Sequence, residues 1–304
     1  MTAIVSVGLP VFNGADYLAA SIDSILSQEY TNLELIISDN ASTDGTQTII
    51  REAAARDGRV RPHFSRTNMG AAWNFNYVLE VSRGRYFRWA GHDDLILPGF
   101  LDTCVGVLSA APDDNILCYT KSYLTDAEGD VLIEYEDRMH LQDDLPSDRL
   151  SAYLRNVRLV NFFFGLWKRS ALIATRRLGA YAAADIVLIA ELAMAGKFIE
   201  VPDRLFVRRR HPDASWLAVG KYERFADWFD PTRDHRLVFP TWRISRELLR
   251  GVRLAGVSSA ERRRLYRAVL LDYSLRKKGA LLRELLRVPQ VMVHSLSSRD
   301  SSIG

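Results

Sequence analysis

The chain has 304 residues, of which 48% are hydrophobic and 25% charged, as in an ordinary globular protein and unlike a disordered or fibrous one. This length allows one large α/β domain with an appendage. The formal net charge is only +3, but residues 241–304 contain 14 Arg or Lys and 5 Asp or Glu, so the rest of the chain is mildly acidic. An acidic body without a reader motif argues against a nucleic-acid partner.

Cysteine usage and hydropathy indicate the cellular compartment of the protein. Two cysteines, Cys104 and Cys118, are too few for a disulfide framework, and we expect both to be buried thiols. The N-terminus shows no basic region followed by a long apolar run, and no stretch reaches 18 uninterrupted apolar residues. We therefore expect a soluble cytoplasmic protein.

The first 98 residues alternate between short strand-like runs, the first of them rich in β-branched residues, and helical periodicity. We expect strands at 4–11, 33–38, 60–64 and 86–90, and helices that end near residue 28, pass through 49–53 and span 71–81. Such alternation predicts a parallel sheet covered by helices. Polar loops at 10–14, 39–45 and 91–95 follow strands, so they should share the sheet edge at which open α/β sheets bind ligands. The aromatic residues Trp73, Phe75 and Tyr77 are more typical of core packing than of sugar stacking.

Beyond residue 98 the alternation is looser. We expect helices at 100–110, 169–175 and 185–195, and strands at 116–120, 131–135, 198–201 and 205–209. The polar residues 136–147 should form a loop over the site, and from about residue 241 only helical periodicity remains. We therefore expect a domain at 1–215, with a nucleotide-binding half at 1–98 and an acceptor half at 99–215, and then a basic helical region at 216–304.

Two adjacent carboxylates, Asp93 and Asp94, follow the fourth expected strand. Buried carboxylates are costly unless a cation lies between them. One interpretation is a divalent-metal site of oxygen ligands that is shared with a ligand's phosphates. The other is a solvated acidic turn. No dinucleotide fingerprint follows the first strand and no P-loop occurs, so the sheet is neither a standard dehydrogenase half nor a P-loop NTPase.

Several segments occur in an order and spacing that match one known family. They are residues 5–13, 38–46, 68–70 and 91–94, then 184–185, 195–198 and 208–211. On these segments, which span about residues 1–215, the chain resembles the family-2 glycosyltransferases. Those are inverting, nucleotide-sugar-dependent enzymes with the GT-A fold. The resemblance implies a Rossmann-like, mostly parallel central sheet flanked by helices, here with a helical C-terminal extension.

The resemblance also implies roles for individual residues. The implied nucleotide-binding residues are Pro10, Phe12, Asn13, Asp39, Asp44, Asn68, Gly70 and His92. Among them, Asp39 would hydrogen-bond the base, although an Asx-turn is the alternative. The implied cofactor is Mn²⁺ or Mg²⁺, held by Asp93 with Asp94 or His211. The implied general base is Asp185.

Two positions depart from the family's pattern. Gly91 stands where the first acid of an Asp-X-Asp motif is expected, and Ala184 stands where a Glu usually precedes the base. Metal binding would therefore rest on Asp93. A helix N-terminus favours the ionised form of Asp185, which could alternatively be the N-cap of its helix.

The basic segment before the turn at Pro212 has more than one interpretation. His211 could bind diphosphate or metal, or could be an ordinary loop residue. Arg208, Arg209 and Arg210 could neutralise phosphate or could simply be solvated.

The implied reaction transfers a sugar from a nucleotide-diphosphate sugar of the UDP, dTDP or GDP type. Its acceptor would be a hydroxyl of a glycan or lipid-linked molecule, in the assembly of a cell-surface polysaccharide or glycolipid. One alternative is a non-catalytic sugar-nucleotide-binding protein, which Gly91 and Ala184 would fit. The other is a nucleotidyltransferase, which usually carries a glycine-rich basic loop where this chain has Val11-Phe12-Asn13-Gly14.

The basic C-terminal region has two interpretations. Apolar residues repeat at helical spacing between 265 and 286, interleaved with Arg and Lys. The region could be a helical cap packed on the body, with solvated arginines. It could instead lie on an anionic membrane surface near a lipid-linked acceptor, which would place the enzyme peripherally at the inner face of the plasma membrane. The sequence predicts no oligomeric state.

Overall fold

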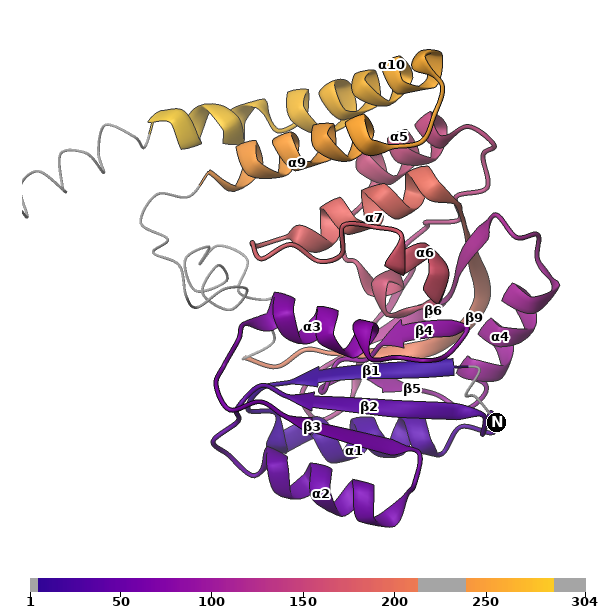
Figure 1. The fold of residues 1–304 in the computed structure, drawn as a ribbon, viewed down its shortest axis with the longest axis vertical. Helices are drawn as coiled ribbons and strands as arrows, with labels where there is room; N and C mark the ends of the chain where they lie inside the picture. Colours follow the sequence, from indigo (N-terminus) through magenta and orange to yellow (C-terminus); the bar gives the residue numbers. More distant parts are fainter. Residues whose placement is uncertain (1–4, 213–238, 287–304) are drawn as a thin grey trace, which may run out of the picture.

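A computed structural model describes residues 5–212 and 239–286 (Figure 1). Its centre is a nine-stranded mixed sheet in the order β3-β2-β1-β4-β8-β6-β9-β5, with β7 paired to β6. The strands β1 to β4 are all parallel. The predicted α/β fold, with a mostly parallel sheet, flanking helices and a helical C-terminal region, is confirmed.

The N-terminal part follows its sequence pattern closely. Its strands are β1 (Val5–Val11), β2 (Leu33–Asp39), β3 (Val60–Phe64) and β4 (Tyr86–Trp89). Its helices are α1 (Ala15–Leu26), α2 (Thr46–Arg56) and α3 (Ala71–Glu80). Strands β1, β2 and β4 are buried along their whole length and place apolar side chains on both faces of the sheet, whereas β3 at the sheet edge is only partly buried.

Two hydrophobic cores lie on opposite faces of the sheet. Val7 and Leu9 of β1 point into one of them, together with Leu18 of α1 and Ile50 of α2. The other core contains Trp89 of β4, Val78 of α3 and residues of helices later in the chain. Figure 1 shows α1 and α2 below the sheet and α3 above it. Both predicted thiols, Cys104 and Cys118, are free and buried.

The second part contains elements that were predicted incompletely. Its helices are α4 (Phe100–Ala110), α5 (Pro146–Asn156), α6 (Arg169–Ile173) and α7 (Ala184–Ala195), with a 3₁₀ turn η1 at Asn161–Phe164. Its strands are β5 (Leu95–Ile96), β6 (Asn115–Thr125), β7 (Val131–Tyr135), β8 (Leu166–Lys168) and β9 (Lys197–Arg209). The two strands predicted at 198–209 are one long strand, whose register against β6 shifts near Pro202. Proline lacks an N–H for the ladder, so the sequence pattern breaks there.

The prediction that residues 136–147 lie over the site was wrong. This segment packs along β6 and β9: the Met139 N–H donates to the Tyr119 hydroxyl, and Leu141 exchanges backbone hydrogen bonds with Phe198. Both Met139 and Leu141 are buried. The segment then enters α5 at Pro146, a favourable first helical residue, although no helix was predicted there.

The C-terminal helices pack on the body. They are α9 (Pro240–Leu254) and α10 (Ser259–Ala268), followed by a π-helical segment η3 (Val269–Leu275) and further helix over 278–286. Leu248 of α9 and Leu265 of α10 belong to the same core as α5 and α7. No helix within 5–212 or 239–286 is long and apolar enough to cross a membrane. The predicted domain boundary at 215 lies outside the described residues, so that division stays a prediction.

Candidate active site

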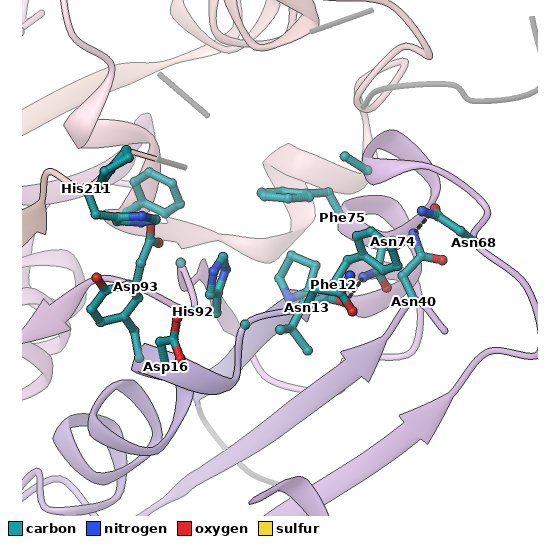
Figure 2. A pocket seen from close by; sticks show the side chains of 18 residues that line it. Phe12, Asn13, Asp16, Asn40, Asn68, Asn74, Phe75, His92, Asp93 and His211 are labelled. Atoms are coloured by element: carbon teal, nitrogen blue, oxygen red, sulfur yellow. Dashed lines mark hydrogen bonds and ion pairs between the residues drawn. The ribbon is translucent and has the colours of Figure 1, made fainter. Parts of the chain in front are cut away.

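A pocket of about 520 Å³ opens at the carboxyl ends of β1 and β4. This volume falls within the range of small-molecule sites. Its lining comes from the loops after the strands β1 to β4, the starts of α1 and α3, the turn η1 and the end of β9: Pro10, Val11, Phe12, Asn13, Gly14, Asp16, Tyr17, Asn40, Asn68, Ala71, Asn74, Phe75, Gly91, His92, Asp93, Phe164, His211 and Pro212. Figure 2 shows amide side chains at one end, and Asp93 and His211 at the other.

The floor of the pocket is the loop after β1, which the neighbouring loop after β2 holds in place. Asn13 has a positive φ of 51°, and its side-chain oxygen accepts the Thr43 N–H at 2.9 Å. Asp44 accepts the N–H groups of Ala15, at 3.1 Å, and of Thr46, at 3.0 Å. Although burial opposes the shift, hydrogen bonds from Thr46 and Ala15 lower the pKa of Asp44. Asp44 does not line the pocket and positions the loop from behind it.

Amide groups form the first end of the pocket. The Asn68 Oδ1 atom accepts from Asn40 Nδ2 at 2.8 Å and from the Gly70 N–H at 2.9 Å. The Asn40 Oδ1 atom accepts the Met69 N–H at 2.9 Å. Gly70 is the N-cap of α3 with a φ of 84°, a conformation that favours glycine. These bonds fix the 65–70 loop and leave the Asn68 Nδ2 group without a protein partner among the described residues.

Asn74 closes the same end from α3. Its Nδ2 group donates to Ser38 O at 2.9 Å and to Val11 O at 3.3 Å, which fixes the orientation of the amide. Its Oδ1 atom is buried and has no hydrogen-bond partner among the described residues. A buried acceptor without a donor is costly, so this end offers an acceptor to an N–H group that enters.

Asp39, the predicted base contact, lies beneath this end and outside the lining. It is fully buried at the end of β2. Its Oδ2 atom accepts from Gln47 Nε2 at 2.9 Å, and its carboxylate also accepts the Ser42 N–H. The contact with Ser42 is a local turn contact that spans three residues, whereas an Asx-turn bonds the N–H two residues on.

An acid and an imidazole form the second end. The Asp93 Oδ2 atom lies 3.0 Å from His211 Nε2, although 118 residues separate them in the chain. His211 is only 7% exposed, and its ring packs against Tyr17 at 4.7 Å between centroids. Although burial opposes the shift, the His211 hydrogen bond and the neighbouring histidines lower the pKa of Asp93. Asp93 is therefore held as a carboxylate.

Asp94 points away from the pocket. Its Oδ1 atom accepts the Arg209 N–H at 3.2 Å. Burial and the Asp93 charge raise its pKa to about 7, against the opposing charges of Arg208 and Arg88. The structure thus brings Asp93 and His211 together but leaves Asp94 behind them. Arg208 and Arg209 are half-buried, in contrast to the solvated alternative, and Arg208 donates to Asn161 Oδ1 at 2.6 Å.

The geometry around Gly91 explains how the chain accommodates its departure from Asp-X-Asp. A Cβ atom at residue 91 would lie 2.7 Å from Asp94 Oδ2 and 2.8 Å from Asp93 Oδ1. Both carboxylates therefore fold back over the space that a side chain would occupy. Gly14 has a similar role, because a Cβ there would lie 2.5 Å from the His92 ring.

The donor set at the second end suits a divalent cation only in part. Within the described residues, no group of three or more His, Cys, Asp or Glu side chains is arranged to hold a metal ion. However, the 3.0 Å between Asp93 Oδ2 and His211 Nε2 matches two adjacent ligands of an octahedral ion with bonds of roughly 2.1 Å. The carboxylate suits Mn²⁺ or Mg²⁺, whereas imidazole is more typical of Zn²⁺, Cu²⁺ or Fe²⁺; the remaining ligands could come from phosphate oxygens and water.

Asp185 lies in the first turn of α7. The N-cap of this helix is Ala183, with a φ of 60°, so Asp185 is not the cap. Desolvation by burial raises its pKa, against hydrogen bonding to the Ile186 N–H and the charge of Arg208. The favourable charge of the helix N-terminus would lower the pKa of Asp185, but the effect of burial is larger. Asp185 does not line the pocket.

Several pocket residues were not predicted from the sequence: Asp16, Tyr17, Asn40, Asn74, Phe75 and Phe164. Two signals could have found some of them. Ala71, Asn74, Phe75 and Val78 share one face of a helix that starts at the ligand edge, and Asn40 directly follows a strand that ends there. Phe75, expected in the core, is thus partly a wall of the pocket.

Comparisons with known proteins agree with this architecture. The family model described as Glycosyl transferase family 2 matches residues 6–171, more than half of the chain. An uncharacterized glycosyltransferase of Rickettsia bellii is 33% identical over 154 residues, which are 50% of this chain and 21% of that protein. One of Rickettsia typhi is 34% identical over 123 residues, 40% of this chain and 37% of that protein. The chain therefore spans well under half the length of these relatives.

Solved structures extend the similarity of fold. The crystal structure of S. aureus TarS 1–349 in complex with UDP-GlcNAc has a TM-score of 0.67 at 14% identity, covering 96% of this chain and 81% of that one. The mannosyltransferase PcManGT from Pyrobaculum calidifontis, in complex with GDP-Man and Mn²⁺, has a TM-score of 0.56 at 16% identity, covering 100% and 81%. By its match over residues 6–171, this chain belongs to glycosyl transferase family 2.

Proposed function

We propose that the protein is an inverting, metal-dependent glycosyltransferase that moves a sugar from a nucleotide-diphosphate donor to a hydroxyl group. The observation that carries the proposal is the pocket itself. It combines a neutral amide end, suited to a nucleoside, with an Asp93–His211 pair at 3.0 Å, suited to a metal-bound diphosphate. Both ends lie at the sheet edge at which α/β proteins bind ligands.

The amide end supports a donor of the UDP, dTDP or GDP type. Uracil, thymine and guanine carry a ring N–H, whereas the corresponding ring nitrogen of cytosine is an acceptor. The buried Asn74 Oδ1 atom, which has no donor among the described residues, would favour a base with an N–H. Pro10, Phe12 and Asn13 would border the nucleoside, Asp39 and Asp44 would support it from below, and His92 would stand between the two ends (Figure 2).

Asp93 and His211 would hold Mn²⁺ or Mg²⁺ together with the donor's phosphates. When bound, such an ion neutralises the charge that develops on the leaving diphosphate. Asp94 would act behind them, by fixing the Arg209 backbone next to His211. PcManGT, of similar fold, is seen with GDP-Man and Mn²⁺.

Asp185 would be the general base. The acceptor oxygen attacks the anomeric carbon, the bond from that carbon to the diphosphate oxygen breaks, and the Asp185 carboxylate takes the hydroxyl proton. Attack opposite the leaving group inverts the configuration. A base acts best when its pKa lies near the working pH, and burial moves the pKa of Asp185 in that direction.

The acceptor would be a glycan or a lipid-linked molecule of a cell-surface polysaccharide or glycolipid. A cytoplasmic enzyme bound peripherally to the inner face of the plasma membrane would meet such an acceptor, and the basic C-terminal helices are suited to that location.

A donor screen tests the proposal. Thermal shifts should be measured with UDP, dTDP, GDP and CDP sugars, each with and without Mn²⁺, because a ligand that binds only the folded state stabilises it by mass action. We expect one of the first three to stabilise the protein in a Mn²⁺-dependent way, and CDP sugars to do so least. Metal-dependent hydrolysis of the preferred donor separates an enzyme from a non-catalytic binding protein. Stabilisation by no sugar nucleotide, or pyrophosphate-releasing synthesis of one, would contradict the proposal.

A further inference from the structure

The outermost helix of the C-terminal region has two chemically different sides. It runs through α10, η3 and residues 278–286, and it lies at the top of the molecule in Figure 1. Its inner side packs on α5 and α9 through Leu265, Val269 and Tyr273, all buried. Its outer side exposes apolar side chains by 42–71%: Leu270, Leu271, Leu275, Leu282, Leu285 and Leu286. Leucines exposed in this number on one helix mark an interaction surface.

The charges of this helix are separated between the two sides. Its three acids over residues 259–286 are each at most 8% exposed and pair with the body. Glu261 accepts the Ser147 N–H, Asp272 accepts from Ser151 and Arg155, and Glu284 accepts the Thr241 N–H. The exposed charges are therefore all positive: Arg263, Arg264, Arg267, Arg276, Lys277, Lys278 and Arg283.

A solvated helix surface normally mixes charges of both signs. Leucines flanked only by cations match a helix that lies in the interface of an anionic bilayer, with leucines in the acyl boundary and cations at the headgroups. Trp242 of α9 adds an interfacial residue. It is 43% exposed, and its Nε1–H donates to Leu281 O at 3.1 Å, beside the exposed leucines.

We infer that the outer side of residues 263–286, with Trp242, inserts shallowly into an anionic lipid surface. In Figure 1, this helix ends on the side toward which β1 points, where the pocket opens. The inference rests on the proposed function only for its purpose, because lipid binding requires neither donor nor acceptor.

Vesicle binding tests the inference with the full chain. Sedimentation with phosphatidylglycerol–phosphatidylcholine vesicles should exceed that with pure phosphatidylcholine, and should fall at high salt. The triple variant Leu282→Ser, Leu285→Ser, Leu286→Ser should bind at least about tenfold more weakly, because apolar burial is lost while the charge is kept. The triple variant Arg276→Gln, Lys277→Gln, Lys278→Gln should lose the preference for anionic lipid.

Matched controls are available elsewhere on the surface. Val131, Leu132 and Ile133 of β7 are 49–57% exposed, and their replacement by Ser should leave vesicle binding unchanged. Replacement of the exposed Arg51, Arg83 and Arg85 by Gln should likewise have little effect. Lipids with brominated acyl chains should quench part of the tryptophan fluorescence, and that part should vanish in Trp242→Phe.

Three results would overturn the inference. They are failure of the parent chain to bind anionic vesicles at low salt, equal binding of the leucine variant and the parent, and an oligomer without vesicle binding that the leucine variant dissociates. A chain that binds vesicles but transfers no sugar would contradict the proposed function alone. A chain that transfers sugar without binding vesicles would contradict this inference alone.

Discussion

At one end of the pocket, neutral amides from neighbouring segments hydrogen-bond one another, as Asn40 does with Asn68. At the other end, Asp93 meets His211 across 118 residues of sequence, with a second buried acid directly behind. The groups at the amide end are neutral, so its affinity should depend little on pH or ions. The charged end brings two buried acids together, so under the proposed function it would take a divalent cation. Binding can therefore be separated into a constant part and a cation-dependent part.

The largest effect should come from a residue at neither end. Asp185→Asn keeps the shape of the side chain but cannot accept a proton from the acceptor. Sugar transfer at saturating donor should fall by about 10²–10⁴-fold, mostly in kcat, while donor affinity at both ends stays intact. Asp148→Asn, in the first turn of α5 and exposed, is the matched control and should transfer normally. Transfer by the Asp185 variant at close to the parent rate would exclude it as the base.

Asp93→Asn should break the charged end alone. The amide can still hydrogen-bond to His211, but it offers no charge to a cation, so Mn²⁺-dependent binding of the nucleoside diphosphate should weaken by about a hundredfold. Metal-independent binding of the nucleoside should persist through the amide end. Calorimetry of both ligands, with and without Mn²⁺, measures the two parts. Asp16→Asn removes an exposed carboxylate from the same pocket and should change neither part; if it abolishes metal dependence and the Asp93 variant does not, the assignment is wrong.

Gly91→Asp should not restore a stronger metal site. The new side chain would meet Asp93 Oδ1 and Asp94 Oδ2, with the Cβ atom only 2.7–2.8 Å away from them. Overpacking of this kind costs about 1–3 kcal/mol, so we expect lower stability and weaker Mn²⁺ affinity. Gly91→Ala adds only the Cβ atom and should show much of the same loss. An increase in Mn²⁺ affinity in the Asp variant would show that the two carboxylates move aside.

The pH dependence of transfer should separate chemistry from nucleoside binding. Burial raises the pKa of Asp185 above its ordinary 3.8, so the carboxylate is protonated, and inactive as a base, as the pH falls through that raised value. On the acid side, kcat should therefore fall by about tenfold per pH unit, whereas nucleoside affinity stays flat. Arg208→Gln removes an opposing charge and should move the acid limb to higher pH. If kcat falls over the same pH range in both proteins, the charge of Arg208 does not affect the pKa of Asp185.

The two ends also differ in how far the sequence predicted them. Asp93 and His211 were identified because their segments resemble a family, not because periodicity could bring them together over 118 residues. At the amide end, Asn68 was identified in the same way, but Asn40 and Asn74 were not, since their role depends on tertiary contacts with Met69 and Ser38. In the fold, local patterns predicted β1 to β4 well, whereas β5 has only two residues and exists through pairing with β9. Hydrophobic periodicity specifies elements, but it does not specify which loops touch.

The smallest expected effect is at the amide end. Asn68→Ala removes an acceptor from Asn40 and Gly70, and also the free Nδ2 group that faces the pocket. One net hydrogen bond to the nucleoside is worth about 1 kcal/mol, or roughly fivefold in Kd. Because the lost groups are neutral, the loss should be the same at every pH and with or without Mn²⁺.

Asn76→Ala is the matched control, since Asn76 also makes two hydrogen bonds, both to Leu178 and outside the pocket lining. It should lower the melting temperature without changing nucleoside affinity. A loss in Asn68→Ala that grows with Mn²⁺ would mean that the two ends are coupled, and that the division of the pocket into a constant and a cation-dependent part fails.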